Sequence, residues 1–142
     1  MAGHTDLLRN RIFSLQWVDG ARYSTERVNA KELDPATGNS RDITFRASAG
    51  LTAFRTAAPS YAGMAYCPTN GQFFFLHPGQ MGQFYVVTPN DSNRWDIEVV
   101  AAAGLVPSSS GLLCKRFLWV PALNGFVLQA NSNNALYFMR MA

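Results

Sequence analysis

The chain has 142 residues, of which 48% are apolar, so it is long enough for one domain with a substantial hydrophobic core. Charged residues make up only 15% and the net charge is +3, which argues against a nucleic-acid-binding protein, because such proteins usually carry a strong basic excess. No apolar run approaches the length of a membrane span, and the N-terminus lacks the apolar segment of a signal peptide. The sequence does not fix a localisation, and we expect the cytoplasm or a virion.

The first third of the chain predicts short strands separated by turns. Asp6 is placed to cap one helical turn within residues 1–11. Ile12–Val18 is rich in strand-forming residues, and Asp19-Gly20 after it is a hairpin signal leading into a more polar edge strand, Ala21–Val28.

Turn-forming residues then predict a loop at Leu33–Asn39, followed by a short strand at Asp42–Phe45. Ala47–Gly63 is small and polar and predicts a surface connection. The rest of the chain predicts a tight turn at Asn70-Gly71 and further strands at Phe73–Leu76, Phe84–Val87, Trp95–Val100, Phe117–Val120, Phe126–Ala130 and Leu136–Met141. Helical periodicity is absent from most of the sequence, which therefore indicates an all-β chain.

A pattern that occurs twice is the strongest signal in the sequence. Five features recur at a spacing of 52 to 54 residues. They are Pro35-x-x-x-Asn39-x-x-Asp42-Ile43 with Pro89-x-x-x-Asn93-x-x-Asp96-Ile97, Ala47–Leu51 with Ala101–Leu105, Tyr66-Cys67-Pro68 with Trp119-Val120-Pro121, Asn70-Gly71 with Asn124-Gly125, and Phe84-Tyr85-Val86 with Leu136-Tyr137-Phe138. A period near 50 with about four strands is typical of a β-propeller blade.

The repeated unit resembles Kelch-type, galactose-oxidase-like propeller repeats. The resemblance rests on an aromatic-x-Pro strand end, an Asn-Gly turn, an apolar strand, and an aromatic strand running into the sequence TPNDSNRW at 88–95. It covers roughly residues 30–142. It implies antiparallel propeller-like blades in an incomplete ring of fewer than three, and the alternatives are a β-sandwich or an open sheet. The expected organisation is a single all-β domain over 1–142, with N-terminal strands at 1–29, one repeat copy at 30–83 and an incomplete copy at 84–142.

Residues that carry chemistry are sparse. Cys67 and Cys114 show no metal-site spacing, and a buried free thiol is the more common fate of such a residue. His77 has no second histidine near it, so the copper site of galactose-oxidase-like enzymes is not expected. Asp42 and Asp96 recur in register, which favours turn caps that accept backbone N–H bonds over a catalytic pair. We therefore expect no cofactor, no metal and no enzymatic activity.

Aromatic and amide side chains remain as candidate contacts for a ligand or partner. They are Trp17, Tyr61, Tyr85, Trp95, Asn131 and Asn133. Aromatic rings stack on sugars and amides bind hydroxyl groups, but core packing and turn formation are the stronger explanations of these residues. The sequence predicts a non-enzymatic module for binding or assembly, with protein or glycan partners and a homo-oligomer or virion component as the expected form. The alternative is the C-terminal fragment of a carbohydrate-active propeller enzyme.

Overall fold

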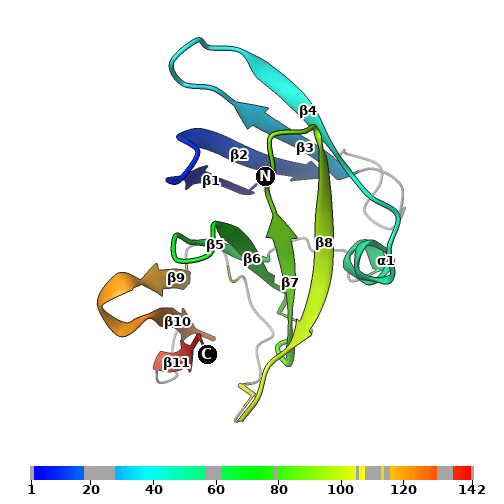
Figure 1. The fold of residues 1–142 in the computed structure, drawn as a ribbon. Coiled ribbons are helices and arrows are strands. Elements are labelled where there is room, and N and C mark those ends of the chain that lie inside the picture. The colour runs from blue at the N-terminus through cyan, green and yellow to red at the C-terminus, as the bar shows by residue number, and fades with distance from the viewer. Residues whose placement is uncertain are drawn as a thin grey trace.

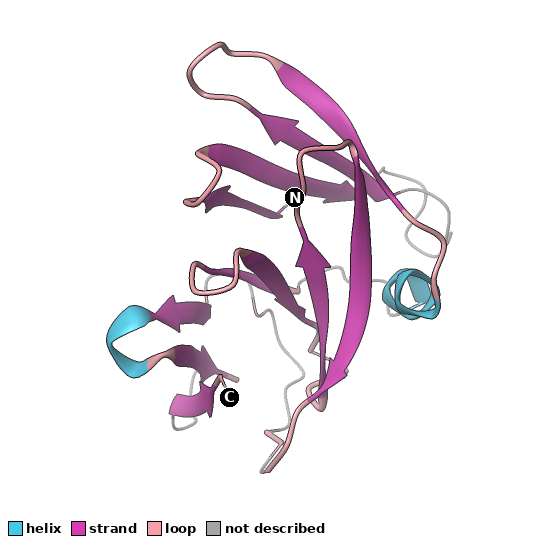
Figure 2. Ribbon diagram, in the orientation of Figure 1, coloured by secondary structure: helices cyan, strands magenta, loops and turns pink. Residues whose placement is uncertain are grey.

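The computed structural model describes residues 2–17, 28–56, 62–78, 80–104, 106–107, 113, 116–130 and 136–141. Figure 2 shows that these residues are mainly strands, so the expectation of an all-β chain is confirmed. The elements in order are β1 (Ala2–Asp6), β2 (Arg11–Trp17), β3 (Val28–Leu33), β4 (Ser40–Phe45), α1 (Ala49–Thr56), β5 (Gly63–Cys67), β6 (Gln72–Leu76), β7 (Gln83–Thr88), β8 (Arg94–Ala101), β9 (Phe117–Val120), a 3-10 turn η1 (Pro121–Leu123), β10 (Gly125–Gln129) and β11 (Leu136–Arg140).

The strands form three antiparallel meanders, in which each strand pairs with the next along the chain. The first meander is β1–β4, the second is β5–β8 and the third is β9–β11. The first and second join into one eight-stranded sheet because β4 pairs with β8 in parallel, through Thr44 with Arg94 and Phe45 with Trp95. At the other end of this sheet β1 lies against β5, so the sheet is barrel-like and nearly closed (Figure 1).

The loops of the first hairpin of every meander share their length and one backbone feature. Four residues separate the last pair of the two strands, at 7–10, 68–71 and 121–124. The fourth residue of each loop has a positive φ: 49° at Asn10, 70° at Gly71 and 45° at Asn124. Glycine and asparagine tolerate this left-handed conformation better than other residues. The loops are therefore longer than the two-residue turn that Asn-Gly suggests, and the N-terminal hairpin is a third example of the same unit.

Repeated sequence features occupy matching strands. Asp42-Ile43 lies on β4 and Asp96-Ile97 on β8, the fourth strands of their meanders, and both isoleucines are buried. Pro68 and Pro121 each follow the first strand of a meander, where a missing N–H costs little. One feature does not match, because Ala47–Leu51 enters a helix whereas its counterpart leaves β8 through Gly104, which has a φ of +92°.

The core lies between the meanders, in two layers. Phe13, Leu15 and Ile43 of the first meander pack with Phe73, Phe75 and Trp95 of the second, and Leu51 and Phe54 of α1 join this layer. On the opposite face of the second meander, Phe74, Leu76 and Phe84 pack with Phe117, Phe126 and Leu128 of the third. This arrangement explains the unbroken apolar run Phe73–Leu76: a strand buried on both faces needs no polar alternation.

Three expectations need correction or fall outside the described residues. Ala47–Gly63 is not only a surface connection, because it contains α1, whose Ser48 side chain caps it by accepting the Leu51 N–H at 3.0 Å. Asp6 is the last residue of β1 and caps a turn and not a helix, because residues 7–10 form the β1–β2 hairpin turn. The Asp19-Gly20 turn and all of Ala21–Val28 except Val28, which begins β3, lie outside the described residues.

The division of the domain at 83/84 falls inside β7 and stays a prediction.

Candidate functional site

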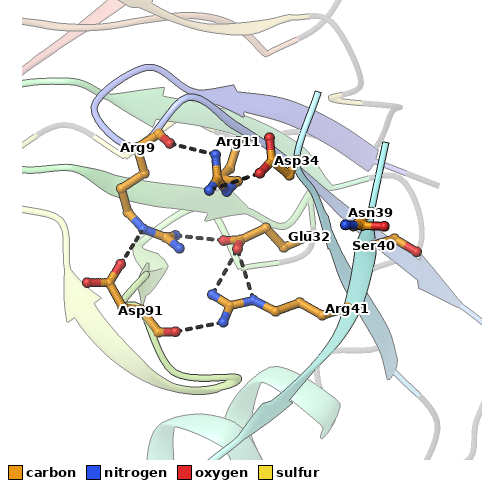
Figure 3. Close-up of a pocket in the computed structure, with 8 residues that line it drawn as sticks. All are labelled: Arg9, Arg11, Glu32, Asp34, Asn39, Ser40, Arg41 and Asp91. Carbon is orange, nitrogen blue, oxygen red and sulfur yellow. Dashed lines mark hydrogen bonds and ion pairs between the residues drawn. The ribbon is translucent and has the colours of Figure 1, made fainter. Parts of the chain in front are cut away.

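A charged cleft opens where the β1–β2 turn, the β3–β4 turn and the β7–β8 loop meet. Its volume is about 390 Å³, and the residues that line it are Arg9, Arg11, Glu32, Asp34, Asn39, Ser40, Arg41 and Asp91 (Figure 3). Three arginines and three carboxylates therefore face one small space. The strand order creates it, because the first meander and the β7–β8 loop are separated in sequence but adjacent in the nearly closed sheet.

Asp6 organises the floor beneath this cleft. Its side chain is 1% exposed, and Oδ1 accepts hydrogen bonds from the backbone N–H groups of Leu8 and Arg9, both at 3.1 Å. The hydroxyl of Tyr66, on β5, donates to the same oxygen at 2.6 Å. A buried carboxylate needs such donors because burial without them is costly. This one residue therefore shapes the β1–β2 turn and ties β1 to β5.

Glu32 is the second buried carboxylate and lies between two arginines. Arg9 Nη1 is 2.7 Å from Glu32 Oε2, while Arg41 reaches Oε1 with Nη2 at 2.8 Å and Nε at 3.0 Å. The Glu32 side chain is 3% exposed. Removing one partner from such a group leaves a buried charge unbalanced, which is strongly destabilising. The Arg9–Glu32–Arg41 triad is therefore a rigid wall of the cleft.

The β7–β8 loop closes the cleft through Arg41 and Trp95. Arg41 donates to the backbone carbonyls of Asp91 at 2.6 Å and Asn90 at 3.4 Å. The Trp95 indole N–H lies 3.1 Å from the Asn90 carbonyl and 2.9 Å from that of Ser92. The guanidinium carbon of Arg9 stands 5.5 Å from the centre of the Trp95 ring, within the range of a cation–π contact. The side chains of Arg41 and Trp95 thus both fix the backbone of the β7–β8 loop.

The pKa shifts of Arg9 and Tyr66 agree with the contacts described above. Burial by itself lowers the pKa of Arg9, but the hydrogen bond and charge of Glu32, aided by Asp6 and Asp91, outweigh it and raise the pKa. Burial and the hydrogen bond to Asp6 raise the pKa of Tyr66 to about 12. Both groups therefore keep their protons at neutral pH, so the cleft offers N–H donors and paired carboxylates. Among the described residues, no cluster of histidine, cysteine and carboxylate side chains could hold a metal ion.

Dispersed arginines on this chain suggest a solvated face, so the sequence gives no sign of the cleft. Arg9 is only 21% exposed at its side chain, and two of its acidic partners, Glu32 and Asp91, come from distant positions in the sequence. Glu32 lies in a short strand next to Lys31, and only the strand pairing shows that one of these two faces inward. Asp42 and Asp96, expected to cap turns, instead pair with Lys31 and Arg46.

A second candidate surface is the outer face of the third meander. Leu118, Val127 and Phe138 lie directly opposite one another on β9, β10 and β11, so they form one apolar row on a single face. Leu118 is 55% exposed and Phe138 is 49% exposed, and Leu136 beside them is 68% exposed. The Phe138 ring covers Gly125, where a Cβ would lie 2.7 Å from Phe138 Cε2.

Two of the aromatic residues proposed as contacts, Tyr85 and Trp95, lie in the core. Tyr85 and Trp95 are 0% exposed and belong to the core, so neither ring can stack on a sugar in the folded chain. Trp17 is the last residue of β2, and its side chain lies outside the described structure. Tyr61, Asn131 and Asn133 also lie outside the described residues, as does Cys114, whereas Cys67 is a buried free thiol.

No protein-family model, curated protein or solved structure matches this chain. None of the helices in the described residues is long and apolar enough to cross a membrane. Functional inference therefore depends on the two surfaces described above.

Proposed function

We propose that this protein is a non-enzymatic β-repeat module that assembles with a second copy of itself through the outer face of the third meander. The observation that carries the proposal is the apolar row of Leu118, half-buried Val127 and Phe138, in which Leu118 and Phe138 are exposed, with exposed Leu136 beside it. Soluble chains rarely leave a continuous apolar sheet face in water, and such faces mark interaction sites.

The packing between the meanders supports the proposal that the outer face of the third meander is an assembly interface. The second meander meets each of its neighbours face to face through aromatic and aliphatic side chains, and both of its faces are buried. The outer face of the third meander carries the apolar row together with Gln129 and Arg140, and none of the described residues covers it. A further sheet packed on this row would continue the mode of packing that the chain already uses twice.

The charged outer face of the first meander favours a symmetric dimer over a head-to-tail chain of molecules. The outer face of the first meander carries the Lys31–Asp42 pair, whose side chains are 54% and 77% exposed. Packing Leu118 and Phe138 against this pair would strip water from two charges, which is costly. Two copies that join third meander to third meander bury apolar against apolar, as a two-fold interface allows.

The meanders themselves are proposed to be propeller-like blades of the Kelch type. The repeated four-residue hairpin loops and the matching places of Ile43 and Ile97 support this interpretation. In this proposal the module joins others by stacking blade on blade.

Native mass spectrometry at micromolar concentration tests the proposed function. We expect a dimer for the unaltered chain and a folded monomer for Phe138→Lys and for Leu136→Lys. Ile12→Lys is the matched control, because Ile12 is a 38% exposed apolar residue on the outer face of the first meander. It should remain dimeric. A monomeric unaltered chain, or loss of the dimer in Ile12→Lys alone, would overturn the proposal.

A further inference from the structure

We infer that the charged cleft is a binding site for a small carboxylic acid, and that the side chain of Asp91 occupies the ligand's place in the unbound protein. This inference is independent of the proposed assembly, because the cleft and the outer face of the third meander share no residue.

Arg9 Nε is the atom that points to a missing ligand. It is buried and has no hydrogen-bond partner among the described residues. Asp91 Oδ1 lies 3.6 Å from it, which is beyond hydrogen-bond reach (Figure 3). A buried N–H group without an acceptor is costly, so an oxygen closer to this atom would stabilise the cleft. The other side of the Arg9 guanidinium is already engaged, since Nη1 contacts Asp6 and Glu32.

Asp91 holds its position weakly. Its side chain is fully exposed, whereas its backbone carbonyl is fixed by Arg41 at 2.6 Å. The carboxylate can therefore swing away without disturbing the loop, while the wall made by Arg9, Glu32 and Arg41 stays in place. A carboxylate ligand would compete with this side chain for Arg9, because Asp91 Oδ1 lies only 3.6 Å from Arg9 Nε.

The charges that line the cleft favour a singly charged carboxylate as the ligand. The lining holds three arginines and three carboxylates when Asp91 is in place. A singly charged carboxylate that replaces Asp91 restores this balance and offers the planar pair of oxygens that a guanidinium binds well. A phosphate brings nearly two charges next to the buried Glu32, so it fits less well. The cleft volume of about 390 Å³ is within the range of small-molecule sites.

The test uses the full chain labelled with ¹⁵N-arginine, with sodium acetate as the probe. The Nε–H resonance of Arg9 is followed by NMR during titration at constant ionic strength, with sodium chloride as the reference salt. We expect a saturable shift with acetate, and a weaker response to sodium phosphate. Asp91→Ala should bind acetate about two- to fivefold more tightly, because it removes an exposed competing charge of modest strength.

Asp42→Ala is the control for the change in net charge, because Asp42 is an exposed carboxylate that does not line the cleft. Its affinity for acetate should match that of the unaltered chain. Equal shifts with acetate and chloride, no saturation in Asp91→Ala, or tighter binding of phosphate than of acetate would each overturn the inference. Both aspartates are exposed, so neither substitution should prevent folding.

Discussion

The second and third meanders are built from similar residues but differ in how much of their apolar surface is exposed to water. β6 carries Phe73–Leu76, all of which are buried, whereas β11 carries Leu136 and Phe138, which are 68% and 49% exposed. The difference comes from position in the stack. The second meander has a neighbour on each face, and the third has one neighbour only among the described residues. A strand's apolar content therefore does not tell how much of it is buried, which depends on the neighbours of its sheet.

Truncation of one phenylalanine in each meander should give the largest contrast. Phe74 faces the third meander and is 4% exposed, so Phe74→Ala should lower the free energy of unfolding by about 3–5 kcal/mol. Phe138→Ala should cost less than about 1 kcal/mol in the monomer, because half of that ring already contacts water. Urea unfolding at a concentration where the chain is monomeric measures both. Equal losses would show that the outer face of the third meander is not open.

The packing of the third meander against the second can be disturbed by a substitution at Gly63. A Cβ at this position would lie 2.8 Å from the Phe117 Cβ and 3.1 Å from the Leu113 carbonyl oxygen. Gly63→Ala should therefore cost about 1–3 kcal/mol of stability by overpacking. Gly3→Ala, on β1, is the control, since its Cβ would meet the Phe13 carbonyl oxygen at 3.5 Å and the Ser14 Cβ at 4.0 Å, which are ordinary contact distances. Thermal unfolding of both variants is the measurement, and a neutral Gly63→Ala would contradict this close approach of β5 and β9.

The contact between the first and second meanders depends on pH through Tyr66. Tyr66→Phe should cost about 1–3 kcal/mol near neutral pH, because Asp6 loses a buried donor. The folded state raises the pKa of Tyr66 from 10.0 to about 12, so it keeps the proton where the unfolded chain has lost it. The free energy of unfolding should therefore fall as the pH rises from 10 to 12. Denaturation curves across this range should show a smaller fall in Tyr66→Phe, and an unchanged slope would count against the bond.

The exposed ion pair between Arg46, which follows β4, and Asp96 of β8 should matter least. Arg46 and Asp96 have side chains that are 49% and 44% exposed, and water screens such pairs. Arg46→Ala should lower stability by about 0.2–1 kcal/mol, and added salt should remove most of that difference. The measurement is urea unfolding at low and high ionic strength. A larger, salt-independent loss would mean that this pair, and not the apolar layer beneath it, joins the two meanders.

Much of the strand content follows from local sequence. β6, β8 and β9 are dense in β-branched and aromatic residues, and the predicted strands Phe73–Leu76, Trp95–Val100 and Phe117–Val120 match them within two residues. α1 escapes prediction because it is short, and a single capping serine is a weak signal in a segment of small polar residues. The third copy of the hairpin is hidden because Asn10 takes the left-handed conformation without a glycine beside it.

The candidate site is much harder to predict than the strands. Arg9, Glu32, Arg41 and Asp91 meet only after β3 pairs with its neighbours and β4 pairs with β8. No local pattern encodes those pairings. Tyr85 and Trp95 are a simpler case, because aromatic side chains suit both ligand stacking and core packing, and burial alone separates these uses.

The matching loops at 7–10, 68–71 and 121–124 bear on the order of folding. Each hairpin closes between neighbours in sequence, so each can form in microseconds as an independent nucleus. The β4–β8 contact joins residues about fifty positions apart, and such distant contacts form late because closing a long chain segment is entropically slow. We therefore expect the first two hairpin nuclei to form separately and to join only when the parallel strands β4 and β8 meet, which makes that encounter the rate-limiting event.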